Sequence, residues 1–527
     1  MNYALCIANY VVQNIKIVIY NPHTSHGNPI PTTRSTNMQY ILAIDQGTTS
    51  STVMIIDETL AVCGTASCEF PQHYPKPDFV EHNSDEIWQS VLEAIGTAIA
   101  RARIDARQIA AIGLTNQRET TLVWDRQTGK CLYNAIVWQC RRTTDTCKKL
   151  KERGLDPMIR TKTGLLCDPY FSATKIRWIL DETDSQDKAE AGALCFGTID
   201  TFLLWQLTSG QVHATERSNA SRTLLMNLET LDWDDDLLEI FRVPRTMLPR
   251  ILNNDAIFGY TKGVPGLPDG IPISGIMGDQ QAALFGQICF SPGDAKCTFG
   301  TGAFLLMNTG SHIVRSQHGL LSTCAWQLGN QPTYALEGSA FVAGALVQWL
   351  RDGLGIIQSS AEVEALANTV SDSGGVILVP ALTGLGAPHW NPNARGIITG
   401  ITRATTKGHI AYAALMGICQ QNTDLLEAMS NDLHSKLTTV RVDGGASINN
   451  LLMQMQADLL NTHLVRPQNL QTTAQGAAMC AALGTGMFKS LEDLRKSWQA
   501  DMEFAPQMPD AQRLAARRAW KDAVQKA

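Results

Sequence analysis

The chain has 527 residues, enough for roughly two to four domains. Hydrophobic residues make up 44% and charged residues 17% of it, a composition typical of globular proteins with large cores. The formal net charge is -6 and no long basic run occurs, so neither nucleic acid nor an anionic membrane is expected as a partner. No uninterrupted apolar stretch is long enough to cross a bilayer.

The cysteine pattern predicts free thiols. The thirteen cysteines are scattered, odd in number, and form neither a CxxC pair nor a zinc-ligand spacing. We therefore expect reduced thiols in a cytoplasmic protein.

Residues 1–37 differ from the rest of the chain. Leu5 to Tyr20 is apolar but interrupted by polar residues, and it lacks the basic start and small-residue cleavage site of a signal peptide. Asn21 to Asn37 is rich in Pro, Thr, Ser and Asn, as linkers are. We expect 1–37 to be an N-terminal extension, either disordered or a non-native start.

The first candidate site follows the apolar run that begins at Tyr40. That run leads into Asp45, a Gly-Thr-Thr-Ser turn, and a second apolar run, Val53–Ile56, which predicts a β-hairpin. The turn can present backbone N–H groups and hydroxyls to phosphate oxygens, and Asp45 can hold Mg²⁺ through water. An ordinary glycine turn with an aspartate at its entry is the equally open alternative.

The next elements predict an α/β protein. Asn83 and the acidic residues after it cap a helix whose apolar positions, Ile87 to Ile99, recur every four residues. A strand at Ile109–Leu114 ends in the polar segment Thr115–Glu119. Polar residues at the carboxyl end of a strand are where α/β proteins place ligands.

The second half repeats this pattern. Ala295–Phe299, a Gly-Thr-Gly turn and Ala303–Met307 predict another hairpin, which suggests a duplicated core with nucleotide between two halves. Later, Val440–Asp443 runs into Gly444-Gly445 and a helix, a joint that a phosphate or ribose can approach closely. Neither a GxGxxG fingerprint nor a P-loop motif is present.

Asp279 follows Gly278 at the end of a short apolar segment. Its carboxylate could accept a hydroxyl proton during group transfer. On local sequence alone, a helix N-cap is the better supported use of this aspartate, and both uses are compatible.

Two further pairs of residues each allow a structural and a ligand-binding interpretation. Arg118 and Glu119 could form a surface ion pair of little value or could bind neighbouring hydroxyls together. Trp138 and Tyr170 are aromatic residues among polar neighbours, so they could belong to the core or could wall a small polyol site.

Together these strings resemble the FGGY family of carbohydrate kinases, in the actin/hexokinase/Hsp70 superfamily. The matching strings occur in the family's order: Asp45–Ser50, Thr115–Glu119, Trp138–Arg142, Asp168–Trp178, Gly278–Gln281, Gly300–Gly302 and Gly444-Gly445. The second and third strings are similar to the glycerol branch of the family.

The resemblance implies two ribonuclease-H-like (actin-like ATPase) α/β domains flanking a deep catalytic cleft. Residues 38–288 would form the N-terminal domain, with the glycerol and phosphate side, and 289–527 the nucleotide side. The implied reaction is ATP-dependent phosphorylation of glycerol to sn-glycerol 3-phosphate, the first step of glycerol catabolism, by direct in-line transfer. A homo-oligomer, dimer or tetramer, is also implied.

The same resemblance implies roles for individual residues. Asp279 would be the catalytic base and Asp45 the Mg²⁺ ligand. The implied glycerol site consists of Arg118, Glu119, Trp138, Tyr170, Asp279, Gln280 and Phe304. The implied ATP site consists of Thr48, Thr49, Ser50, Thr301, Gly344, Gln348, Gly445 and Asn449.

Among the positions that depart from the family pattern, one follows the predicted phosphate turn. Thr52 stands where many members carry Arg, and threonine cannot supply a charge-assisted bond near the phosphates. Thr52 is the support for one alternative, a catalytically weak regulatory homologue; a kinase for another polyol or ketose is the second alternative, and the Arg118-Glu119 and Trp138 strings argue against it. A peptide-binding chaperone ATPase is disfavoured because no separate β-rich module follows.

Overall fold

The computed structural model describes residues 38–391, 393–435 and 437–527, so the predictions for 1–37 lie outside it. Gln39–Ala527 forms one compact unit. Within the described residues, no helix combines the length and the apolar character that crossing a membrane requires. The twelve described cysteines are all free thiols, as predicted.

The first sheet has six strands. Their order is β13 (Ile257–Tyr260), β14 (Pro272–Gly278), β5 (Ile109–Asn116), β1 (Tyr40–Gln46), β2 (Ser50–Asp57) and β3 (Val62–Glu69). Strands β1, β5 and β14 run parallel to one another, while β2 returns antiparallel to β1. The predicted hairpin, β1 and β2, and the predicted strand at Ile109–Leu114, which lies in β5, are therefore confirmed.

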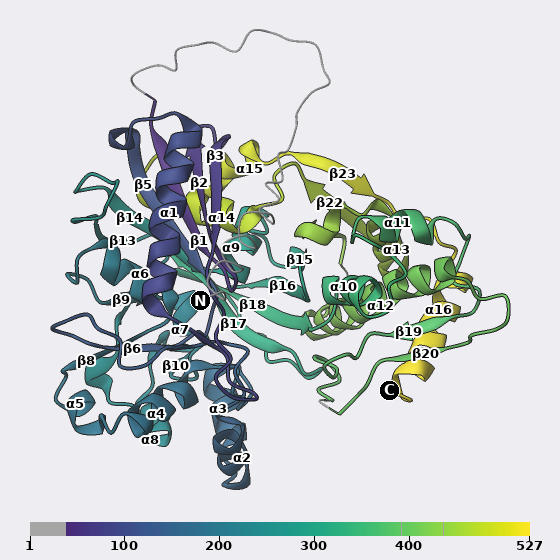
Figure 1. Cartoon of the computed structure of the whole chain (residues 1–527), viewed down its shortest axis with the longest axis horizontal. Helices are drawn as coiled ribbons and strands as arrows, with labels where there is room; N and C mark the ends of the chain where they lie inside the picture. The colour runs from purple at the N-terminus through teal and green to yellow at the C-terminus, as the bar shows by residue number, and fades with distance from the viewer. Residues whose placement is uncertain (1–37, 392, 436) are drawn as a thin grey trace, which may run out of the picture. The chain divides into compact units, whose positions relative to one another are not determined.

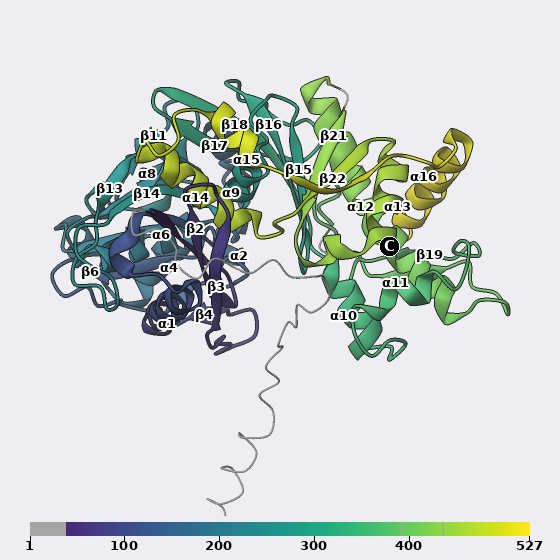
Figure 2. The ribbon, with the colours of Figure 1, turned by 90° about the horizontal axis from the view of Figure 1, so that it is seen from above.

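The second sheet has the same central arrangement. Its order is β17 (Leu321–Leu328), β18 (Gln331–Ala340), β16 (Ala303–Gly310), β15 (Ala295–Phe299), β21 (Thr439–Asp443), β22 (His463–Pro467) and β23 (Ala500–Phe504). An antiparallel hairpin again stands beside two parallel strands, β21 and β22. The two sheets, drawn in Figures 1 and 2, thus repeat a hairpin beside parallel strands, which confirms the predicted duplicated α/β core.

Helix α1 (Ser84–Ala102) packs on β2 and β3 of the first sheet. Its N-cap is Asn83, whose side chain accepts hydrogen bonds from the backbone of Asp85 and Glu86, as the capping pattern predicts. The helix ends where Arg103 adopts a left-handed conformation.

Two helices far apart in sequence pack closely together. In α9 (Asp279–Gly286), a Cβ at Gly286 would lie 2.1 Å from the carbonyl oxygen of Thr472, the first residue of α14 (Thr472–Gly484). A Cβ at Gly476 would lie 1.9 Å from the carbonyl oxygen of Ala282. Helix α14 also packs against β1, β5 and β14, so an element near the chain's end covers the first sheet. The boundary between 288 and 289 stays a prediction.

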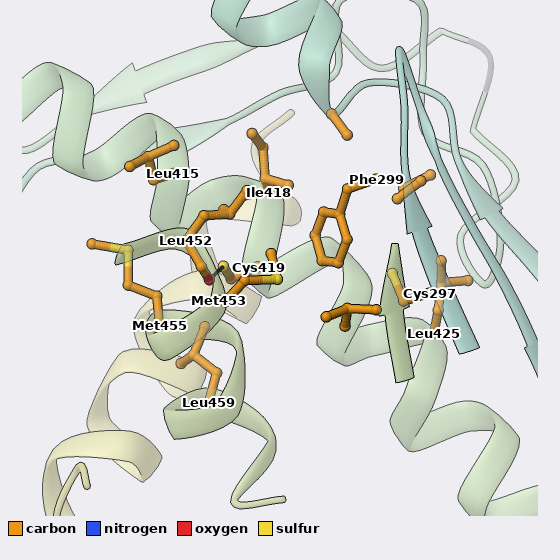
Figure 3. Packing of buried hydrophobic residues seen from close by; sticks show 14 of the residues in the cluster. Cys297, Phe299, Leu415, Ile418, Cys419, Leu425, Leu452, Met453, Met455 and Leu459 are labelled. Carbon is orange, nitrogen blue, oxygen red and sulfur yellow. Dashed lines mark hydrogen bonds between the residues drawn. The ribbon is translucent and has the colours of Figure 1, made fainter. Parts of the chain in front are cut away.

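The core of the second half lies between its sheet and two helices, α12 (Lys407–Leu433) and α13 (Asn450–Leu460). Figure 3 shows Cys297 and Phe299 of β15 facing side chains from both helices. There the thiol of Cys419 donates to the carbonyl oxygen of Leu452 over 3.4 Å, which ties α12 to α13.

The remaining elements connect or cover these layers. The other helices are α2 (Thr144–Glu152), α3 (Asp156–Thr163), α4 (Ser172–Glu182), α5 (Gln186–Glu190), α6 (Ile199–Leu207), α7 (Arg217–Ala220), α8 (Asp235–Phe241), α10 (Gly344–Asp352), α11 (Glu362–Ala367), α15 (Leu491–Ser497) and α16 (Asp510–Val524). Five two-stranded pairs complete the described strands: β4 (Glu81–His82) with β7 (Ala135–Ile136), β6 (Leu122–Asp125) with β8 (Leu194–Gly197), β9 (Ala214–Glu216) with β12 (Arg250–Leu252), β10 (Met226–Asn227) with β11 (Asp232–Trp233), and β19 (Ile377–Val379) with β20 (Ile397–Thr399).

Candidate active site

The first hairpin presents Asp45 and a hydroxyl-rich turn. The backbone N–H of Gly47 donates to the carbonyl oxygen of Ser50 over 2.9 Å and closes the turn, at whose tip Thr49 is exposed. Among the residues that the structure describes, none makes a hydrogen bond or ion pair with the Asp45 carboxylate. Burial, followed by the charge of Asp279, raises the pKa of Asp45 to about 7.

A buried polar network supports this turn from behind. Gln117 donates to Gln46 over 3.0 Å, His82 bonds Gln72 over 2.7 Å, and Gln72 donates to the carbonyl oxygen of Thr48 over 3.0 Å. Burial lowers the pKa of His82 to about 4, so its ring is neutral at pH 7. The turn is therefore held from below by neutral hydrogen bonds rather than by a charged group.

Arg118 and Glu119 follow β5 and are buried, so the surface ion-pair alternative is wrong. Their side chains are only 2% exposed. Arg118 Nε lies 3.0 Å from Asp279 Oδ1 and 4.0 Å from Glu119 Oε1. Glu119 adopts a left-handed backbone with φ of +58°, an uncommon conformation for a residue other than glycine.

Asp279 is the first residue of α9, and the cap position belongs to Gly278. The N-cap prediction for this aspartate is therefore wrong by one residue. Asp279 Oδ1 instead accepts a hydrogen bond from the backbone of Gln280 over 2.6 Å and faces Arg118. Burial raises the pKa of Asp279, while the Arg118 guanidinium opposes that rise. The side chain keeps 30% of its surface exposed, so a ligand can reach it.

Gln280 is held by a buried lysine of the second sheet. Lys296 Nζ donates to the side-chain oxygen of Gln280 and, over 2.8 Å, to the hydroxyl of Thr298. Burial lowers the pKa of Lys296. Because Lys296 lies on β15, this contact joins the start of α9 to the second hairpin.

Three predicted aromatic residues lie together. The ring centroid of Trp138 lies 5.7 Å from that of Tyr170 and 6.4 Å from that of Phe304, both in edge-to-face geometry. The indole N–H of Trp138 donates to the Thr48 hydroxyl over 3.0 Å. All three rings are half-buried, which suits walls of a small site better than residues of a closed core.

The predicted nucleotide residues of the second half gather around the second hairpin. The backbone of Gly344, at the start of α10, donates to the carbonyl oxygen of Gly300 over 2.9 Å, and a Cβ at Gly344 would lie 2.7 Å from that oxygen. Thr301 and Gln348 are exposed beside this contact, on the turn and on α10.

A second close approach brings the β21 joint to the same hairpin. A Cβ at Gly444, where φ is +85°, would lie 2.6 Å from the carbonyl oxygen of Phe299. The following Gly445 is exposed with open space around it, and Asn449 caps α13 by accepting from the backbone of Leu452. Asp443 is buried and accepts from Gln287 and Thr472, which fixes the end of β21.

Sequence reasoning missed two charged residues that complete the site, Arg222 and Glu337. Arg222 lies 2.7 Å from Glu119 and 2.9 Å from Glu337, and Glu337 lies 2.5 Å from Arg118. The signal for Glu337 was available, because it is the one charged residue in the largely apolar run from Tyr334 to Ala340.

Lys175 was also missed, although it lies inside Asp168–Trp178, one of the segments that resemble the family. Its ammonium group is buried in α4 and donates to the carbonyl oxygens of Glu119 over 3.1 Å and Tyr170 over 2.7 Å. Burial lowers its pKa to about 7. Lys175 thereby fixes the backbone of two predicted site residues.

Two hollows in the structure lie elsewhere. One of about 590 Å³ is lined by residues of α12, α16 and the segments around His318 and His389, and one of about 240 Å³ is lined by Arg160 and Arg315 among others. Neither is lined by any of the predicted site residues. The deep catalytic cleft therefore stays a prediction.

Comparison with known proteins shows close relatives over nearly the whole chain. The chain is 55% identical to glycerol kinase of Bdellovibrio bacteriovorus, with 92% of this chain and 99% of that protein covered. It is 53% identical to glycerol kinase 2 of Thermotoga maritima, with 92% and 98% covered.

Solved structures also match this chain over nearly its whole length. The crystal structure of Plasmodium falciparum glycerol kinase with ADP matches with a TM-score of 0.87 at 37% identity, covering 93% of this chain and 98% of that one. Gluconate kinase from Lactobacillus acidophilus matches with a TM-score of 0.82 at 22% identity, which shows a shared fold. Residues 40–286 and 295–485 match the N-terminal and C-terminal domains of the FGGY family of carbohydrate kinases. The chain belongs to this FGGY family, and the predicted two-domain α/β fold is confirmed.

Proposed function

We propose that this chain is a glycerol kinase, which transfers the γ-phosphoryl group of ATP to a primary hydroxyl of glycerol. The observation that carries the proposal is the ion pair between the buried Arg118 and the partly exposed Asp279, held beside the hydroxyl-rich turn after Asp45. A carboxylate that can take a hydroxyl proton thus stands next to a turn suited to phosphate oxygens. The relatives named above support glycerol as the acceptor.

Glycerol would be bound through both its polar and its apolar surfaces. Arg118 and Glu119 offer donors and acceptors to neighbouring hydroxyls, and Gln280 would add an amide held in place by Lys296. Trp138, with Tyr170 and Phe304, would pack on the carbon backbone.

The reaction is a direct in-line transfer without a covalent enzyme intermediate. The glycerol oxygen forms a bond to the γ-phosphorus as the bond from that phosphorus to the β–γ bridging oxygen breaks, and ADP leaves. Asp279 accepts the hydroxyl proton as the new bond forms. Positioning supplies most of the rate, because the phosphoryl transition state needs orientation and charge stabilisation.

The nucleotide would lie mainly against the second half. Thr48, Thr49 and Ser50 would donate to its phosphates from the first hairpin and Thr301 from the second, while Gly344, Gln348, Gly445 and Asn449 would surround the remainder. The tight approach of Gly344 to Gly300 and the open space at Gly445 support this, because both leave backbone within reach of a ligand.

Asp45 fits a bound Mg²⁺. Its carboxylate has no partner among the described residues, and no group of three or more His, Cys, Asp or Glu side chains in that part of the chain could hold a metal alone. Mg²⁺ in kinases usually takes one or two carboxylates, waters and substrate phosphates, so a single carboxylate beside a phosphate turn is a suitable donor set. When bound, Mg²⁺ would neutralise charge on the phosphates.

We also propose the features that rest on the resemblance alone: a cytoplasmic homo-oligomer, dimer or tetramer, with a domain boundary between 288 and 289. Sedimentation of the purified chain would measure the first of these directly.

The test is ADP release from Mg-ATP by the purified full chain, with glycerol, other polyols, ketoses and no acceptor in parallel. We expect turnover with glycerol and formation of sn-glycerol 3-phosphate. Faster turnover with a ketose or another polyol would contradict glycerol as the substrate. ATP binding without turnover on any acceptor would favour the regulatory alternative.

A further inference from the structure

The charged residues of the site form one closed cluster, which we call the buried quartet: Arg118, Glu119, Arg222 and Glu337. Each of the four side chains is at most 2% exposed. Two are arginines and two are glutamates, so their formal charges balance inside the protein; burial raises the pKa of Glu119, and the charges of Arg222 and Arg118 oppose that rise. Buried charges are tolerated only when paired and hydrogen-bonded, and removal of one member leaves another uncompensated.

Glu337 uses both of its oxygens to fix Arg118. Its Oε2 accepts from Arg118 Nη1 over 2.5 Å, and its Oε1 accepts from Arg118 Nη2 over 3.1 Å. This two-pronged contact sets the plane of the guanidinium group. The remaining nitrogen, Nε, is then directed at Asp279 Oδ1, 3.0 Å away.

Arg222 in turn fixes the side chains of the two glutamates. Its Nε donates to Glu119 Oε1 over 2.7 Å and its Nη2 to Glu337 Oε1 over 2.9 Å. The guanidinium also lies 5.7 Å from the ring centroid of Tyr170 and 5.3 Å from that of Phe171. Without Arg222, two buried carboxylates would face each other with one cation between them.

The quartet joins the two halves of the chain. Arg118 and Glu119 follow β5 of the first sheet, whereas Glu337 lies on β18 of the second. Strand β18 ends at Ala340, and the chain then reaches Gly344, whose backbone is bonded to the second hairpin. Glu337 is therefore anchored to the half that the proposed function assigns to ATP.

We propose that Glu337 and Arg222 are positioning residues for phosphoryl transfer, Glu337 by holding Arg118 toward Asp279 and Arg222 by holding Glu119 in the substrate site. This inference rests on the proposed function of the same site. Neither residue needs to touch the reacting atoms.

Glu337 keeps its charge in this setting. Burial would raise the pKa of Glu337, but its two arginine partners prevail and bring it to about 2, so Glu337 is anionic at every working pH. The carboxylate can therefore hold both arginines throughout an assay near neutral pH.

The experiment compares Glu337→Gln and Glu337→Asp in the full chain. For Glu337→Gln we expect kcat/KM for glycerol to fall about 100-fold, because a freed Arg118 no longer orients substrate and base. KM for ATP should stay within about threefold. Glu337→Asp keeps the charge but shortens the reach, so it should lose less activity than Glu337→Gln. Arg222→Lys should raise KM for glycerol, because a single ammonium group cannot bond both glutamates in the same geometry.

Glu503→Gln is the matched control, since Glu503 is an exposed carboxylate on β23 of the same sheet. It should change none of these values. A purely structural role for Glu337 predicts fewer folded molecules in Glu337→Gln with kcat/KM per folded molecule unchanged, and that result would overturn the proposal.

A second measurement does not depend on the reaction. Amide hydrogen exchange in residues 115–121 should be faster in Glu337→Gln than in the unaltered chain, while exchange in 463–467 should not change. Unchanged exchange in 115–121 would refute the positioning role. If the unaltered chain failed to phosphorylate glycerol, the proposed function would fail, and the exchange measurement would still decide whether Glu337 positions Arg118.

Discussion

Replacement of Asp45 by asparagine should make the unliganded protein more stable and less active. Asp45 is held in a site where burial and the charge of Asp279 raise its pKa from 3.8 to about 7. A carboxyl group whose folded pKa is raised stabilises the fold below its unfolded pKa and loses that contribution as the pH rises through the folded value. At pH 8 the ionised Asp45 therefore destabilises the unliganded fold, and asparagine removes the charge without changing the shape.

The size of the effect follows from the pKa shift. A rise from 3.8 to about 7 corresponds to about 4 kcal/mol at 1.36 kcal/mol per unit, and partial exposure of Asp45 reduces it. We expect Asp45→Asn to raise the free energy of unfolding by about 1–4 kcal/mol at pH 8. The gain should shrink as the pH falls from 7 toward 4, because Asp45 becomes protonated in the folded protein over that range.

Urea unfolding at pH 4.5, 6 and 8, without nucleotide or Mg²⁺, measures this gain directly. Glu58→Gln is the control, because Glu58 is exposed one residue beyond the end of β2 and should show no gain. Glu216 also has a pKa raised by burial to about 7, but it is present in both proteins and cancels in the difference. An Asp45→Asn protein that is less stable than the unaltered chain at pH 8, or whose gain does not depend on pH, would refute the reasoning.

Three further substitutions test the site. Asp279→Asn should lower kcat by about 10²–10⁴-fold with ATP affinity within about threefold, measured by turnover and by nucleotide titration; near-normal turnover would remove Asp279 as the base. Thr52→Arg places a guanidinium on the strand position paired with Asp45 and should lower KM for ATP about 3–10-fold, whereas unchanged kinetics would mean that the position does not matter here. Lys175→Met should lower kcat/KM for glycerol at least about tenfold by releasing the Glu119 carbonyl. Because burial lowers the pKa of Lys175 to about 7, the unaltered chain should gain stability between pH 7 and 10 that Lys175→Met does not gain, and equal slopes in that range would contradict this.

Much of the fold could be predicted because its signals are local. The hairpin at Tyr40–Ile56 combines two apolar runs with a glycine turn, and the helix after Asn83 combines a cap with a four-residue apolar repeat. Such patterns depend on neighbours in sequence, so a single sequence reveals them. The packing of α14 on the first sheet has no such signal, because it depends on a close contact between Gly476 and a helix almost two hundred residues earlier.

The candidate site was predictable to the extent that its residues lie in short motifs. Arg118 and Asp279 stand in such strings, and the structure brings them to 3.0 Å. The alternatives left open for them could not be resolved locally: whether Arg118 is exposed depends on β18, and whether Asp279 caps a helix depends on where the helix begins. Arg222 and Glu337 stand more than one hundred residues apart and neither lies in a recognisable motif, so only the packing of the segment around α7 against the second sheet makes them neighbours.

The site contains two kinds of charge: the paired charges of the buried quartet and the single carboxylate of Asp45. The buried quartet is neutral as a whole, so Arg118 can be held without a ligand. Asp45 has no such partner among the described residues. Its raised pKa means that ionising this carboxyl group in the folded protein costs free energy. A cation with phosphates would supply such a partner, and its binding would stabilise the ionised carboxylate. Mg-ATP should therefore stabilise the unaltered chain more strongly at pH 8 than at pH 6, after correction for the ionisation of ATP itself, and Asp45→Asn should abolish that difference.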